Sequence, residues 1–466
     1  MYNHNNQYRC IIIRGKSKME LDNLLPAYAI IIDSICPCAK DEFEKLFNQE
    51  FVKILRDKKD DKDVLIKTLN NHRTEIAGKL FGMYYLSYDG IYYASERTKK
   101  FLSDNDQPAF FKDICYKMQF PNGMNRMQTL KSHIDLQISL RPNQFIIKCL
   151  KLAEEIQIIL TVNDIGYYIL NALDVLQGKA TPEEVLNQIK EDRRRGVVRK
   201  IEVPNKASSY TMQHIREQLN YLELANLIYI NHDKQVMINK KEMACVDIFS
   251  KCCIDKPAFD IYSYDISNRM GRERLYKDWD YYYSQLSDMV GYFDTKIDAL
   301  VLDEKKFIKP RVDIDSNIKL GDEGEQFVYE YERKRVGKFN FRLVNKVLPL
   351  GQTKGLGYDI QSVIAEDGEF AEFVKYIEVK STKRVTAPNI SDSTWVDTIN
   401  ITRNEWIAAH QHKEFYSIYR VYFARDGVVV FIINNISEKE KKGVIQIVPT
   451  VYRIDFTNNA VDSILE

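Results

Sequence analysis

The chain lacks the features that mark a secreted or membrane-embedded protein. Its N-terminus is polar, and the apolar run Cys10–Ile13 is too short for a secretory signal peptide. Its 466 residues contain no apolar stretch of about 18 residues that could span a bilayer. We therefore expect a cytoplasmic protein that does not use a membrane.

Cysteine is sparse, and its spacing does not match the common zinc sites. Among the eight cysteines, Cys36 and Cys38 are separated by one proline, and Cys252 and Cys253 are adjacent. Structural zinc sites usually need ligand pairs with roughly two to four residues between them. The cysteines lie in or beside apolar segments, so we expect reduced, buried thiols.

Two further absences reduce the number of function classes that fit the chain. The phosphate-binding pattern Gly-x-x-x-x-Gly-Lys is missing, so we expect no ATP requirement of the chain's own. The formal net charge is only +1, so a surface that binds nucleic acid would have to be local. A hydrophobic content of 45% is enough to form folded cores, and the length suits about two to four domains.

The chain does contain a short motif of acidic and basic residues near residue 380. In the run 376–382, apolar residues alternate with Glu378 and Lys380, which predicts a strand with both charges on one face. These two positions would lie roughly 6–7 Å apart along the strand. A turn at 366–369 would fold the preceding run back beside this strand and bring Asp359 to the same edge.

Two carboxylates and an amine in this arrangement suit the cleavage of phosphodiesters. Asp359 and Glu378 would hold Mg²⁺, with Mn²⁺ as a substitute, because hard cations prefer oxygen ligands. Lys380 would orient the attacking water and offset charge in the transition state. The alternative is an amphipathic surface hairpin whose charges are solvated.

These residues resemble the PD-(D/E)XK nuclease superfamily, in which an Asp precedes Glu-x-Lys on the neighbouring strand. Tyr358 stands where that family has proline. The resemblance implies a further catalytic Glu on the helix before the first core strand. Glu325 is the expected equivalent, and Glu323 is the alternative.

A longer pattern resembles the nuclease-like domain named after the plant protein No Vein, which also occurs in bacterial restriction systems. The motifs are Gly-x-x-Gly-Glu at 321–325, Gly-Tyr-Asp-Ile at 357–360, Glu-Val-Lys-Ser at 378–381 and Asn-Glu-Trp at 404–406. The resemblance covers roughly residues 318–440. It implies an α/β restriction-endonuclease-like domain with a mixed central sheet, in a bacterial protein.

The region before this domain is mainly helical and contains two units that resemble winged helices. Each unit, at 59–103 and 201–254, combines helical spacing with two short strands around a turn. We predict a multidomain chain with four parts: a winged-helix-like domain at 1–103, a helical region with a second winged-helix-like unit at 104–254, a helical connector at 255–318 and the nuclease domain at 319–466.

Winged helices can place one helix in the major groove of DNA while the hairpin contacts the backbone. The DNA contacts that we predict are Arg73, Lys79 and Arg97 in the first unit, Tyr210, Gln213 and Arg216 in the second, Arg193 and Arg194 at a helix end, and Ser381, Thr382 and Lys383 beside the catalytic strand. The alternatives are a protein-binding scaffold, helix-dipole compensation by the arginines, and packing in a core.

Together these features predict a Mg²⁺-dependent DNA endonuclease of the restriction type, either Type II or modification-dependent. It would act on double-stranded DNA and leave 5′-phosphate and 3′-hydroxyl ends. One catalytic site cuts one strand, so a double-strand break would require a homodimer or transient pairing. The alternatives are a defence or repair nuclease that a partner targets, and a DNA-binding regulator with an inactive nuclease fold.

Overall fold

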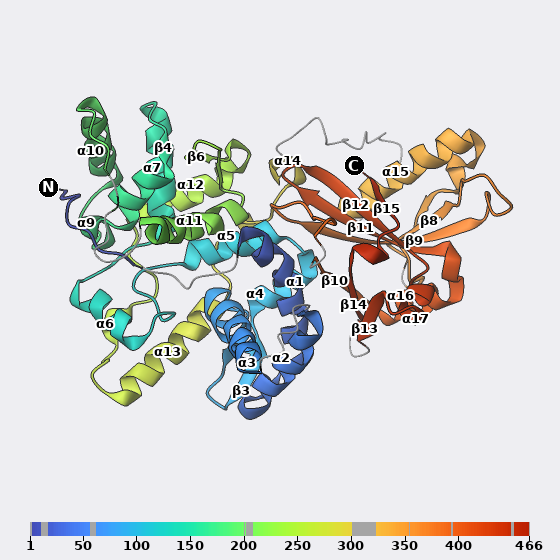
Figure 1. The fold of residues 1–466 in the computed structure, drawn as a ribbon, viewed down its shortest axis with the longest axis horizontal. Coiled ribbons are helices and arrows are strands. Elements are labelled where there is room, and N and C mark those ends of the chain that lie inside the picture. Colours follow the sequence, from blue (N-terminus) through green and yellow to red (C-terminus); the bar gives the residue numbers. More distant parts are fainter. Residues whose placement is uncertain are drawn as a thin grey trace.

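The computed structural model describes residues 2–10, 17–55, 62–199, 201, 208–300, 323–353, 355–392, 395–448 and 452–465. For residues 62, 208–211, 254, 448 and 452–455 it describes the backbone alone. A helical N-terminal half lies beside a C-terminal half built on strands (Figure 1). Among the described residues, every helix is too short or too polar to cross a lipid bilayer.

The first helical unit surrounds a small antiparallel sheet. Its elements are α1 (Lys18–Ile35), β1 (Cys38–Ala39), α2 (Lys40–Ile54), α3 (Lys62–Asn70), a π-helical segment (Asn71–Leu80), β2 (Tyr84–Leu86), β3 (Ile91–Ala94) and α4 (Glu96–Asp104). The two short strands predicted around a turn in the unit 59–103 are confirmed, because Tyr85 of β2 pairs with Tyr93 of β3 across the turn at Asp89-Gly90. Residues 11–16, which include most of the apolar run Cys10–Ile13, fall outside the described residues.

The next stretch of chain completes the helical half. Its main elements are α5 (Gln107–Lys117), α6 (Met127–Asp135), α7 (Pro142–Glu155), β4 (Leu160–Thr161), α8 (Val162–Asp164), α9 (Leu173–Leu176), α10 (Pro182–Arg194), α11 (Ser208–Leu224), β5 (Ile228–Ile230), β6 (Gln235–Ile238) and α12 (Met243–Lys251). Helix α7 ends at Glu155, and Leu160–Thr161 pairs with β6 as a strand.

The segment predicted as a helical connector packs into this half. Its main helix, α13 (Arg269–Ser284), buries Trp279 and Tyr283, and the Tyr283 hydroxyl donates to the Leu80 carbonyl at 2.9 Å. A short helix, α14 (Ile297–Leu300), follows it. The last part of the predicted connector, residues 301–318, lies outside the described residues.

The C-terminal half is organised around one mixed sheet with the strand order β15-β12-β11-β9-β8-β7. The strands are β7 (Leu348–Pro349), β8 (Ile360–Val363), β9 (Val374–Lys383), β11 (Tyr416–Ala424), β12 (Gly427–Asn434) and β15 (Ser463–Leu465). The predicted hairpin is confirmed, since β8 runs antiparallel to β9 and Ile360 pairs with Ile377. In contrast, β11 runs parallel to β9, which requires the long crossover that contains α16 (Arg403–His412).

The tail that follows β12 forms α17 (Ile436–Lys441), β13 (Ile445–Val448), β14 (Tyr452–Phe456) and β15. With β10 (Asp397–Ile401), β13 and β14 make a separate three-stranded sheet in the order β10-β14-β13. The polar run Thr457-Asn458-Asn459 forms a turn that separates β14 from β15, because such residues favour turns over strands.

Candidate active site

Asp359, Glu378 and Lys380 are brought together at the junction of β8 and β9. The Asp359 backbone nitrogen donates to the Ile377 carbonyl at 2.9 Å, and its Oδ2 accepts from the Val379 nitrogen at 2.8 Å. The Glu378 Oε1 lies 2.6 Å from the Lys380 Nζ. The hairpin register therefore places both carboxylates and the amine on one short stretch of sheet.

A fourth charged residue, Glu405, joins this group and was not among the predicted site residues. Its Oε2 lies 2.9 Å from the Lys380 Nζ, so the ammonium contacts two carboxylates. Glu405 lies in the first turn of α16, where it forms a capping box with Thr402. The Thr-x-x-Glu spacing in the sequence signals this helix start, but it does not reveal that the carboxylate faces Lys380.

Because this cluster is buried, its charged groups interact strongly and shift one another's pKa values. Desolvation raises the pKa of Glu378 well above its ordinary value; Lys380 opposes this shift, and Asp359 and Glu405 add to it. Burial alone would lower the pKa of Lys380, but the charges of Glu378 and Glu405 outweigh burial and raise it. Burial and the same three carboxylates also raise the pKa of Tyr416, whose hydroxyl donates to the Gly357 carbonyl at 3.0 Å.

The loop before Asp359 depends on Gly357. This residue has a φ of +77°, a left-handed conformation that side chains disfavour. A Cβ at this position would also collide with the Asn404 carbonyl in the first turn of α16. The absence of a side chain therefore lets α16, and Glu405 with it, lie directly against the loop that carries Asp359.

The two candidates for the upstream Glu lie on α15 (Glu323–Phe339) and point to different neighbours. The Glu325 carboxylate packs against Gly351, and the adjacent Leu350 nitrogen donates to the Asp359 carbonyl at 2.6 Å. Glu323 is half exposed and pairs with Lys383 at 2.8 Å. Glu325 is therefore the one that lies beside the backbone leading to Asp359.

The donor set suits a hard divalent cation. Asp359 and Glu378 supply carboxylate oxygens; burial is the main cause of the raised pKa of Glu378, and a bound cation would offset the repulsion that Asp359 adds to it. Within the described ranges, no group of three or more His, Cys, Asp or Glu side chains could hold one ion. Two protein ligands would leave positions open for water and phosphate, as Mg²⁺ usually requires.

Several predicted DNA contacts are buried inside the protein, which contradicts that role. Arg97 is 1% exposed and pairs with the equally buried Asp113 at 2.7 Å. Arg73 is 8% exposed and donates to the side chains of Asn48 and Asn70. The predictions for these two arginines rested on their positive charge, and charge alone does not show whether a guanidinium group is buried or exposed.

Among the residues that follow Lys380 on β9, Thr382 also differs from the prediction. Thr382 is buried and donates to the Asn105 carbonyl at 3.2 Å, so it holds the two halves of the chain together. Lys383 pairs with Glu323. Side chains alternate along a strand, so Ser381 lies on the face opposite Lys380. The burial of Thr382 and its contact with Asn105 contradict its predicted role as a DNA contact, whereas the DNA contacts of Ser381 and Lys383 remain predictions.

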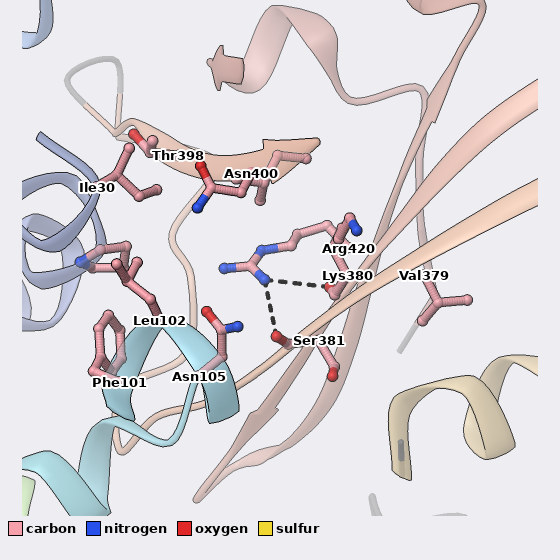
Figure 2. A pocket seen from close by; sticks show the side chains of 12 residues that line it. Ile30, Phe101, Leu102, Asn105, Val379, Lys380, Ser381, Thr398, Asn400 and Arg420 are labelled. Carbon is pink, nitrogen blue, oxygen red and sulfur yellow. Dashed lines mark hydrogen bonds between the residues drawn. The ribbon is translucent and has the colours of Figure 1, made fainter. Parts of the chain in front are cut away.

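A cavity of about 110 Å³ lies where this strand meets the helical half (Figure 2). Its lining includes Ile30 of α1, Asn105 after α4, Asn400 of β10 and Arg420 of β11. Arg420 Nη1 donates to the carbonyls of Lys380 at 3.3 Å and Ser381 at 3.1 Å. Arg420 thus braces the backbone of the strand that carries the charged cluster.

The other predicted DNA contacts lie at or near the surface, mostly in local ion pairs. Gln213 is exposed. The partly exposed cations and their partners are Lys79 with Glu75, Arg193 with Asp164, Arg194 with Glu191 and Arg216 with Glu223. The Tyr210 side chain lies outside the described residues. These contacts remain predictions.

Comparison with known proteins divides the chain at the same place as the structure. Residues 2–280 match the family described as restriction endonuclease BpuJI, N-terminal. Residues 324–433 match the family described as protein NO VEIN, C-terminal. No curated protein matches the chain.

A similar solved structure is described as "Crystal structure of pyrene- and phenanthrene-modified DNA in complex with the BpuJ1 endonuclease binding domain". The two chains are 48% identical, with a TM-score of 0.58, and the match covers 61% of this chain and 100% of that chain. The N-terminal match alone spans more than half of the sequence. The chain therefore belongs to the family defined by the N-terminal region of restriction endonuclease BpuJI.

Proposed function

We propose that this protein is a Mg²⁺-dependent DNA endonuclease of the restriction type. Its helical half would recognise double-stranded DNA, and its C-terminal half would hydrolyse the phosphodiester to 5′-phosphate and 3′-hydroxyl ends. The observation that carries the proposal is the cluster of Asp359, Glu378 and Lys380, in a chain whose N-terminal half belongs to a restriction endonuclease family.

The similar structure supports the assignment of DNA binding to the helical half. That structure is a complex with DNA, and its protein is 48% identical to this chain over its whole length. Gln213 and Arg216 on α11 are the candidates for base contacts, because amide and guanidinium groups can form paired hydrogen bonds to base edges. The exposed Arg194 suits a phosphate contact.

We assign the C-terminal half to the PD-(D/E)XK class of nucleases. An Asp ahead of β8 and a Glu-x-Lys on the antiparallel neighbour β9 support this assignment. Asp359 and Glu378 would hold the cation, which when bound polarises the phosphate and acidifies its water. Lys380 would hold its protonated amine toward the scissile phosphate and offset the charge that develops there.

One cluster of this kind cuts one strand. A double-strand break therefore requires two copies of the chain, either as a homodimer or through transient pairing on DNA, whereas a nick needs only one copy. Product analysis on supercoiled plasmid separates the two cases, because nicked circles precede linear DNA when the strands are cut independently.

The test is cleavage of modified and unmodified genomic DNA by the purified full chain with Mg²⁺ or Mn²⁺, followed by sequencing of the ends. Wild type should produce ends at a defined site. Asp359→Ala and Lys380→Ala should bind DNA but not cut it. Undiminished cutting by either variant would refute the assigned site, and specific binding without any cutting by wild type would favour a DNA-binding regulator instead.

A further inference from the structure

Lys380 is held between two carboxylates that come from different parts of the fold. Glu378 lies on the same strand, and its Oε1 is 2.6 Å from the ammonium nitrogen. Glu405 lies on α16, and its Oε2 approaches the same nitrogen to 2.9 Å. Both carboxylates are well shielded from solvent, so each contact is stronger than a surface ion pair.

Glu405 is itself fixed in place. Its Oε2 accepts from the Thr402 backbone nitrogen at 3.1 Å, and its own nitrogen donates to the Thr402 hydroxyl at 3.3 Å. The start of α16 is packed against the Gly357 loop. The carboxylate that faces Lys380 is therefore anchored by a helix terminus and cannot follow the amine if it moves.

The two carboxylates would differ in how strongly they hold Lys380 once a cation binds. Glu378 is a candidate cation ligand together with Asp359, and a carboxylate that turns toward a cation holds the amine less tightly. Glu405 lies on a different element, and its Oε2 already contacts both the Lys380 ammonium and the Thr402 backbone nitrogen. Glu405 is thus the carboxylate that remains available to Lys380.

We propose that Glu405 is a positioning residue that holds the Lys380 ammonium beside the scissile phosphate while Glu378 engages the cation. This inference rests on the proposed nuclease function and names one further residue of that site. It requires that the loss of Glu405 act through Lys380 and not through the stability of α16.

The chain offers a matched control for that distinction. Glu184 forms the same capping box with Thr181 at the start of α10, far along the chain from β9, with contacts of 3.0 and 3.2 Å. Glu184→Ala therefore removes an equivalent helix cap without touching Lys380. Glu405→Gln keeps an oxygen that can accept from both Thr402 and Lys380 but removes the charge.

The first measurement is single-turnover DNA cleavage, with DNA affinity measured separately in Ca²⁺. Glu405→Ala should slow cleavage by roughly 10- to 100-fold, because a small misplacement of a catalytic group can cost up to about 100-fold in rate. DNA affinity should stay within about twofold of wild type, and Glu405→Gln should recover part of the rate. Glu184→Ala should cleave like wild type.

The second measurement needs no cleavage activity. In metal-free protein at one fixed pH, acetylation of Lys380 by an N-hydroxysuccinimide ester is followed by mass spectrometry. Glu405→Ala should speed this modification several-fold, because the amine loses one of its two partners, and Glu184→Ala should leave it unchanged.

The outcomes separate this inference from the proposed function. If wild type cuts DNA and Glu405→Ala cuts equally fast, the positioning role is overturned and the nuclease function stands. If no variant cuts, wild type included, the nuclease function fails and the positioning role fails with it. An equal loss of rate in Glu405→Ala and Glu184→Ala would also overturn the inference, since it would reduce Glu405 to a helix cap.

Discussion

The effect of a single charged residue in this chain depends on how deeply it is buried and on which groups it contacts. Asp192 near the end of α10 is an example. Its carboxylate is buried and accepts from the Nε and Nη2 of Arg199, at 2.8 and 3.1 Å, and from the Tyr168 hydroxyl at 2.7 Å. These contacts, chiefly that with Arg199, lower the pKa of Asp192 from 3.8 to about 2. The arginine-rich helix end is therefore tied to the core by its own acidic neighbour.

The first prediction concerns the pH dependence of this contact. Because the folded-state pKa of Asp192 is depressed, its stabilising effect is complete above about pH 4 and disappears as the pH falls through about 2. Asp192→Asn should lose about 1–2 kcal/mol of unfolding free energy near neutral pH, after allowance for the partly exposed Arg199. Urea unfolding of both proteins between about pH 7 and pH 3 measures this difference. A difference that grows toward low pH would contradict the prediction.

At the scale of elements, the loop that joins β7 to β8 determines how close α16 comes to β9. Two glycines in this loop have left-handed φ values, +91° at Gly355 and +77° at Gly357. A Cβ at Gly355 would meet no described atom within 4 Å, whereas a Cβ at Gly357 would collide with the backbone of α16. The two positions therefore share one kind of backbone strain and differ in packing.

The second prediction uses that difference. Gly355→Ala should cost about 1 kcal/mol of unfolding free energy from its left-handed backbone alone, with little change in cleavage. Gly357→Ala should cost more and should slow DNA cleavage on the order of 10-fold, because it pushes Glu405 away from Lys380. Urea unfolding and single-turnover cleavage of both variants test this. Equal effects of the two substitutions would show that the contact with α16 does not matter.

At the scale of the whole molecule, the sequence predicted local geometry better than distant contacts. The strand with Glu378 and Lys380 and its pairing with the run after Asp359 follow from alternation and a nearby turn, so a short stretch of chain contains all the information needed. Glu405 reaches Lys380 through a parallel crossover, and the burial of Arg97 depends on Asp113 and Tyr283. Neither relation has a periodic signature in the sequence.

The contacts that join the two halves of the chain also have no local pattern in the sequence. The turn between β11 and β12 carries Arg425, which is buried against the C-terminal end of α11. Its guanidinium donates to the Asn226 side chain at 3.0 Å and to the Glu223 and Ile228 carbonyls at 3.0 and 2.6 Å. The sheet that carries the charged cluster therefore shares a buried polar joint with the helix that we expect to contact DNA.

The last prediction concerns this joint. Arg425→Ala would leave the acceptors on α11 and β5 buried without their donor, and each such group costs about 1–3 kcal/mol. The variant should unfold in two resolved calorimetric steps, with a larger radius of gyration in solution scattering than wild type, because the halves separate before either unfolds. Arg194→Ala, at an exposed helix end, should change neither. If Arg425→Ala unfolds in the same single step as wild type, other contacts between the halves, such as that of Thr382 with Asn105, are sufficient to hold them together.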